Sequence, residues 1–218
     1  MHTDLTALLE PRTDDRPSPA TPAAALARLL AGNRRFAEGR IESPRRALAR
    51  MRRLAEQQAP FAAVVTCSDT RVPSELVFDQ GYGDLHVTCV PGNVVTPEAV
   101  ASIEFAVAEL GVQVVYVLGH TFCSTIAAMA GRDAARADLT ALADHLVPAL
   151  EAAGGSLPAA VERNARWQAE LLVRRSSIVA SALEAGTVTI AAGVLDLVSG
   201  VIAPIAIELP LPRAFEAA

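Results

Sequence analysis

The segment FAAVVTCSDTR, residues 61–71, determines how this chain can fold. Its first five residues are all apolar, a pattern typical of a strand that is buried on both faces of a parallel sheet. A thiol and several polar side chains follow at the point where such a strand ends. In open α/β sheets, ligands bind at the carboxyl ends of the strands. The segment therefore predicts a buried strand that delivers Cys67 to a functional edge of a sheet.

Further apolar runs along the chain predict the rest of that sheet. These runs cover residues 85–90, 112–118, 187–194 and 201–207, and the last of them would pair as an edge strand through a turn at Ser199-Gly200. Helical patterns lie between them, at residues 97–110, 123–130, 137–152 and 159–183. Alternating strands and helices predict an α/β fold, with a mostly parallel central β-sheet flanked by helices and one antiparallel edge strand.

The N-terminal part divides into two segments. Residues 1–20 are acidic and proline-bearing without an apolar period, so we expect a disordered or arm-like tail. Thr21 and Pro22 are typical of a helix start, and Gly39 of a helix end, which predicts an N-terminal helical arm. Residues 21–218 are expected to form a single α/β domain.

Composition excludes several kinds of function. The 218 residues carry a net charge of −5, which argues against nucleic-acid binding. The sequence contains no run of about 18 consecutive apolar residues, so no membrane span is expected. All 19 basic residues are arginine, so lysine Schiff-base chemistry is excluded. The arginines of segment 34–53 are interpreted as a solvated helix face with oligomer contacts. Three cysteines, an odd number, do not make a disulfide scaffold, and a reducing cytoplasm is the expected compartment.

A second segment, Gly119-His120-Thr121-Phe122-Cys123, follows the predicted strand 112–118. If this strand pairs with the first one, Cys67, His120 and Cys123 become neighbours at one sheet edge. Two thiolates, one imidazole and one open position match a catalytic zinc site, because zinc accepts both sulfur and nitrogen. From these residues alone, a redox pair of Cys67 and Cys123, or cysteines that serve only as small buried hydrophobes, remain alternatives.

Five motifs in order resemble β-class carbonic anhydrases. They are CSDTRVP (67–73), FDQGYGDL (78–85), PGN (91–93), SIEFAV (102–107) and GHTFC (119–123). The resemblance implies zinc-dependent, reversible hydration of carbon dioxide to bicarbonate and a proton, by attack of a zinc-bound hydroxide. It also implies one Zn²⁺ per subunit, with Cys67, His120 and Cys123 as its ligands.

The same resemblance assigns roles to four further residues. Asp69 and Arg71 match a dyad in which the arginine holds the aspartate, whose free oxygen accepts a hydrogen bond from the zinc-bound water. In some members this aspartate instead rests on zinc as a fourth ligand. Gln58 matches a glutamine that binds substrate across a dimer interface, and Phe105 matches an aromatic wall of the pocket. A homodimer or a dimer of dimers is implied, in which the N-terminal helix embraces the neighbouring subunit.

Four positions depart from the family pattern. Ser124 stands in place of glycine, Cys89 in place of arginine, Pro91 in place of a small residue and His86 in place of phenylalanine. His86 is either a proton shuttle or an interface residue, because imidazole titrates near neutrality. These departures leave two alternatives to carbon dioxide hydration: a hydrolase of carbonyl sulfide or carbon disulfide, and a zinc-binding homologue with little activity. The intact dyad and glutamine favour an enzyme.

Overall fold

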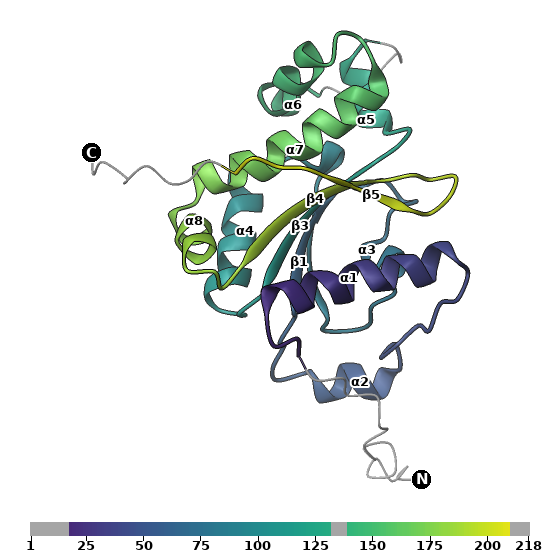
Figure 1. Ribbon diagram of the computed structural model, residues 1–218, viewed down its shortest axis with the longest axis vertical. Coiled ribbons are helices and arrows are strands. Elements are labelled where there is room, and N and C mark those ends of the chain that lie inside the picture. Colours follow the sequence, from purple (N-terminus) through teal and green to yellow (C-terminus); the bar gives the residue numbers. More distant parts are fainter. Residues whose placement is uncertain (1–17, 132–138, 210–218) are drawn as a thin grey trace.

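The computed structural model describes residues 18–131 and 139–209, so most of the expected tail lies outside it. One five-stranded sheet, in the order β2-β1-β3-β4-β5, runs through these residues (Figure 1). Its strands are β1 (Ala62–Thr66), β2 (Leu85–Cys89), β3 (Val114–His120), β4 (Thr189–Leu195) and β5 (Ile202–Ile205). The first four strands are parallel and β5 pairs antiparallel with β4. The predicted α/β fold with one antiparallel edge strand is confirmed.

Helices cover both faces of the sheet (Figure 1). They are α1 (Pro22–Ala37), α2 (Leu48–Arg53), α3 (Ser74–Val77), the 3₁₀ turn η2 (Pro91–Asn93), α4 (Pro97–Ala108), α5 (Ser124–Met129), α6 (Thr140–Ala152), α7 (Leu157–Arg175) and α8 (Ser177–Glu184). On one face α4, α7 and α8 pack over the sheet, and on the other α1 and α3 do so. Strand β1 contributes to the core on both faces of the sheet. Ala63 and Val65 pack in the core with α4, α7 and α8, and Ala62 and Val64 pack in the core with α1 and α3.

Helix α1 covers the sheet of its own chain. Thr21 caps it by accepting a hydrogen bond from the Ala24 N–H, and Ala25 and Leu29 are fully buried in the second core. A Cβ at Gly32 would lie 1.7 Å from the Phe78 carbonyl oxygen, so only glycine allows this close approach. Of the apolar stripe of the predicted arm, Leu29 is therefore buried within its own subunit, and Leu26 and Leu30 are half-buried against the same core.

Several arginines of segment 34–53 make internal ion pairs. Arg35 Nε lies 2.7 Å from Asp79 Oδ2, and Nη2 of the buried Arg45 lies 2.5 Å from Asp84 Oδ2. Both carboxylates belong to the FDQGYGDL motif between α3 and β2. The interpretation of segment 34–53 as a solvated face is wrong for Arg35 and Arg45, since their ion pairs bind the segment to the 79–84 loop.

The predicted helix over residues 159–183 is two helices. Ser176 leaves the helical conformation at the end of α7, with φ of −128° and ψ of 111°. Its hydroxyl accepts a hydrogen bond from the Val179 N–H, which caps α8, and donates one to Glu104. A continuous apolar period hid this break, because a serine cap can stand inside such a pattern.

Candidate metal centre

The structure brings Cys67, His120 and Cys123 together at the carboxyl edge of the sheet. Strands β1 and β3 pair in parallel with Thr66 opposite Leu118, so both chains leave the sheet side by side. The ligand atoms of the three side chains all lie within 4.8 Å of one another, and the two sulfurs are 4.0 Å apart. All three residues are buried, with exposed fractions of 3%, 0% and 5%. Segments 53 positions apart in sequence thus form one compact donor cluster.

A tight turn returns the chain from His120 to Cys123. Phe122 adopts a left-handed conformation with φ of +56°, which is uncommon for a residue other than glycine. Cys123 then occupies the N-cap of α5, where the N–H groups of Thr125 and Ile126 favour its thiolate form. The turn therefore points an imidazole and a thiol at the same place.

The imidazole of His120 is oriented for a cation. Its Nδ1 lies 2.9 Å from the Thr121 carbonyl oxygen, which fixes the proton on Nδ1 and leaves a lone pair on Nε2. Among the described residues, the buried Nε2 has no hydrogen-bond partner. An unsatisfied buried nitrogen costs free energy, and a ligated cation would satisfy it. Two sulfurs and one imidazole nitrogen are the donor set that zinc accepts.

The two thiols compete for negative charge. Hydrogen bonding to Cys123 lowers the pKa of the Cys67 thiol, against the opposing effect of burial, and His120 lowers it further. Hydrogen bonding to the Cys67 sulfur and burial raise the pKa of Cys123, and repulsion between two anions in a buried site adds to this. A divalent cation between them would stabilise both thiolates and remove this conflict.

Asp69 and Arg71 form a two-pronged ion pair beside the cluster. Arg71 Nε donates to Asp69 Oδ1 at 2.8 Å and Nη2 donates to Oδ2 at 2.6 Å, while Nη2 also reaches the Phe122 carbonyl oxygen at 3.1 Å. Hydrogen bonding from Arg71 lowers the pKa of Asp69 to about 2, so this side chain is a carboxylate at neutral pH. Asp69 Oδ2 lies 3.9 Å from His120 Nε2, next to the donor cluster.

Comparison with known proteins identifies the family of this chain. A family model described as carbonic anhydrase matches residues 62–202, which include the whole donor cluster. The chain belongs to the β-class carbonic anhydrase family. The resemblance seen in the sequence motifs is thereby confirmed.

Individual carbonic anhydrases agree with this assignment. Carbonic anhydrase 2 of Mycobacterium tuberculosis is 37% identical over 157 residues, which are 72% of this chain and 68% of that protein. The β-carbonic anhydrase CafA of Aspergillus fumigatus has a TM-score of 0.62 and 26% identity, over 86% of this chain and 92% of its own. A tetrameric β-carbonic anhydrase of Sordaria macrospora shares the fold, with a TM-score of 0.56 and 22% identity over 84% of this chain and 94% of its own.

Two residues expected at the site of a carbonic anhydrase lie away from the cluster in the single chain. Gln58 precedes β1, at the strand end opposite to Cys67, and it is exposed. Phe105 is 50% exposed on α4. Both side chains are exposed, and neither joins the donor cluster of its own chain.

None of the four departures from the family pattern joins the donor cluster. The Cys89 thiol donates to the Cys67 carbonyl oxygen at 3.4 Å. His86 Nε2 lies 2.9 Å from the Ser102 hydroxyl, and burial lowers the pKa of this imidazole. Ser124 is exposed, and Pro91 begins the η2 turn.

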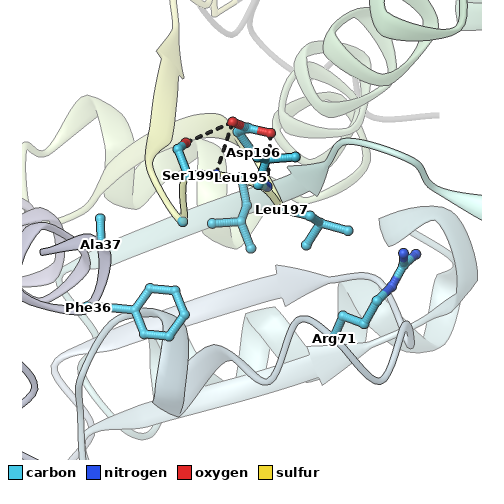
Figure 2. A pocket seen from close by; sticks show the side chains of 9 residues that line it. Phe36, Ala37, Arg71, Leu195, Asp196, Leu197 and Ser199 are labelled. Atoms are coloured by element: carbon cyan, nitrogen blue, oxygen red, sulfur yellow. Dashed lines mark hydrogen bonds between the residues drawn. The ribbon is translucent and has the colours of Figure 1, made fainter. Parts of the chain in front are cut away.

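Two cavities meet at Arg71. One, of about 720 Å³, adjoins Cys123 and is lined mostly by apolar side chains from α5, α7 and β4. The other, of about 490 Å³, lies between the end of α1 and the β4–β5 turn (Figure 2). In Figure 2 the Asp196 carboxylate on its far wall is bound by Ser199. Arg71 therefore lines both cavities.

Two backbone groups of this carbonic anhydrase site were missed in the sequence. The Thr121 carbonyl orients His120, and the Gly92 N–H donates to the Cys67 sulfur at 3.3 Å. Backbone groups leave no signal in the residue types, although the PGN motif at 91–93 includes Gly92, whose N–H is the second of these groups.

Proposed function

We propose that this carbonic anhydrase hydrates carbon dioxide reversibly to bicarbonate and a proton, using one zinc ion per subunit. Cys67, His120 and Cys123 would hold the ion. The observation that carries this proposal is the buried Nε2 of His120, which lacks a partner among the described residues and lies within 4.8 Å of the two sulfurs. Zinc bound there would supply a nucleophile at neutral pH by acidifying a coordinated water.

Asp69 would orient the nucleophile. Its carboxylate is ionised at neutral pH, so it can only accept a hydrogen bond, and its Oδ2 faces the cluster at 3.9 Å from His120 Nε2. Arg71 holds both carboxylate oxygens and thereby keeps Asp69 from moving onto the metal as a fourth ligand. We propose that this paired arrangement is the working state, and that Asp69 bound to zinc would be a resting state.

Carbon dioxide would approach through the apolar cavity beside Cys123. Its lining includes Ile126, Leu157, Val161 and Val194, a surface suited to a small substrate without charge. Bicarbonate, once formed, is an anion that an apolar lining binds poorly, so this surface favours its release.

We further propose that Gln58 binds substrate in the site of a partner subunit, within a homodimer or a dimer of dimers, and that Phe105 forms an apolar wall of the pocket there. The position of Gln58 at the far end of β1 supports this, because the side chain cannot span the strand to reach its own Cys67. The exposed Phe105 ring offers apolar surface for such an interface.

A complementation experiment tests the placement of Gln58. Gln58→Ala alone should lower kcat/KM by about tenfold, the loss of one substrate hydrogen bond. Mixed dimers of Gln58→Ala and Cys67→Ser subunits should regain activity, because one site per mixed dimer then has its own Cys67 and the partner's intact glutamine. Refolded mixtures that are no more active than the Gln58→Ala variant alone would place Gln58 outside the partner's site.

Removal and return of zinc test the proposed reaction. Protein stripped by a chelator should lose carbon dioxide hydration in a stopped-flow indicator assay and regain it when one equivalent of zinc per chain is added. Zinc at 100 times its dissociation constant should also raise the free energy of unfolding by about 2.7 kcal/mol. Zinc binding without hydration, or turnover of carbonyl sulfide alone, would instead support one of the two alternatives.

A reducing cytoplasm suits the proposed site. All three cysteines are free thiols, and oxidation of Cys67 and Cys123 would destroy the donor set. None of the helices within residues 18–131 and 139–209 has both the length and the apolar character of a membrane span.

A further inference from the structure

The Gly92 N–H that donates to the Cys67 sulfur belongs to a strained turn. In η2, Gly92 has φ of +70° and Asn93 has φ of +48°, so two successive residues are left-handed and one of them is not glycine. Such a conformation costs free energy and persists only where neighbouring groups hold it. The direction of the N–H···S bond therefore depends on whatever fixes this turn.

Asn164 of α7 holds the turn from its other side. Its Nδ2 donates to the Gly92 carbonyl oxygen at 2.8 Å and to Asn93 Oδ1 at 3.4 Å. The N–H and the carbonyl of Gly92 flank one Cα atom, so fixing the carbonyl restricts the direction of the N–H. Asn164 is 1% exposed and reaches the metal cluster only through this backbone.

Gln168 fixes Asn164 in turn. One helical turn further along α7, its Nε2 donates to Asn164 Oδ1 at 3.0 Å and to the His145 carbonyl at 2.9 Å, while its Oε1 accepts the Val95 N–H at 2.8 Å. Every amide hydrogen of the two side chains has an acceptor. A buried network in which both of these amides are satisfied is rigid, so it can hold a strained turn in place.

We propose that Asn164, supported by Gln168, is a positioning residue for the metal centre: it sets the Gly92 N–H···S bond to Cys67 and so strengthens metal binding. This inference rests on the proposed zinc function. A hydrogen bond to a thiolate restricts the sulfur and draws charge from it, which changes how the sulfur donates to a metal. Neither amide contacts a group of the donor cluster directly, so the effect passes through the backbone of the turn.

The test compares two variants of the full chain that differ in what they remove from α7. Asn164→Leu keeps the number and branching of the side-chain heavy atoms and removes the donor to Gly92. It should weaken zinc affinity about 10–100-fold in competition with a chromophoric chelator, and shift the thiolate-to-metal charge-transfer band of cobalt-substituted protein. Leu172→Ala removes a fully buried α7 side chain from the core under α4 and α8. It should lower the melting temperature but leave zinc affinity and the cobalt band unchanged.

The outcomes separate this inference from the proposed function. Asn164→Leu protein with the affinity and the cobalt band of the original chain would overturn the inference, and so would an equal effect of Leu172→Ala. An original chain that binds no zinc would instead refute the proposed function. If Asn164→Leu does not fold, Asn164→Asp replaces it, because the aspartate keeps the acceptor for Gln168 but sets an oxygen against the Gly92 carbonyl; its affinity decides the matter in the same way.

Discussion

Replacing Cys67 with serine is expected to bring carbon dioxide hydration down to the uncatalysed rate. The buried cluster offers three protein ligands, and a serine hydroxyl at neutral pH is a far poorer zinc ligand than a thiolate. Because enzymes accelerate their reactions by about 10⁶-fold or more, losing the metal removes essentially all of the rate. The measurement is stopped-flow hydration together with the zinc content per chain.

The third cysteine provides the matched control for this substitution. Cys89 is exposed, and its thiol touches the Cys67 carbonyl oxygen rather than joining the donor cluster. Cys89→Ser should therefore keep one zinc per chain and most of the activity. A Cys67→Ser protein with full zinc and unchanged turnover would contradict the proposed ligand set, and loss of zinc from Cys89→Ser would add that residue to it.

Replacing Arg71 with lysine is expected to slow hydration about 10–100-fold while zinc stays bound. The guanidinium spans both oxygens of Asp69 and also reaches the Phe122 carbonyl, whereas a lysine ammonium is a point donor and cannot hold two oxygens in one plane. The released carboxylate lies 3.9 Å from His120 Nε2 and can move onto the metal. Turnover is measured on protein of known zinc content.

Two comparisons show whether Arg71 acts through Asp69. Arg166 forms an exposed ion pair with Glu162 on α7, so Arg166→Lys should leave turnover unchanged. The double variant Asp69→Asn with Arg71→Lys should be no slower than Asp69→Asn alone, because the two changes act on one interaction. Additive losses would mean that Arg71 works independently of the carboxylate.

The fold could be predicted from the sequence where a strand is buried on both faces, because such a strand requires apolar residues at every position. Residues 61–65 and 114–118 had to be apolar throughout, because each strand packs between two layers of helices. The donor cluster followed from the same reasoning, since parallel strands leave the sheet at one edge. The break at Ser176 was missed because a cap formed by a single hydroxyl does not interrupt an apolar period.

The charged residues were harder to interpret than the apolar ones. Arg35 and Arg45 look like surface residues until the chain brings Asp79 and Asp84 to them from more than thirty positions away. Asn164 and Gln168 carried a weak signal, two amides four residues apart on the buried face of a predicted helix. Three of their partners are backbone groups, those of Gly92, Val95 and His145, which no residue pattern displays and only the folded chain identifies.

The spacing of the donors has a consequence for how the protein acquires its ion. Cys67 leaves the ribosome well before His120 and Cys123, and these groups meet only when β1 and β3 pair. In the unfolded polypeptide, a metal that bridges them would have to close a loop of more than fifty residues, which costs chain entropy. In the folded protein the pairing of β1 and β3 has already closed this loop. Loading should therefore follow folding, and newly made subunits should reach their final shape before any zinc is captured.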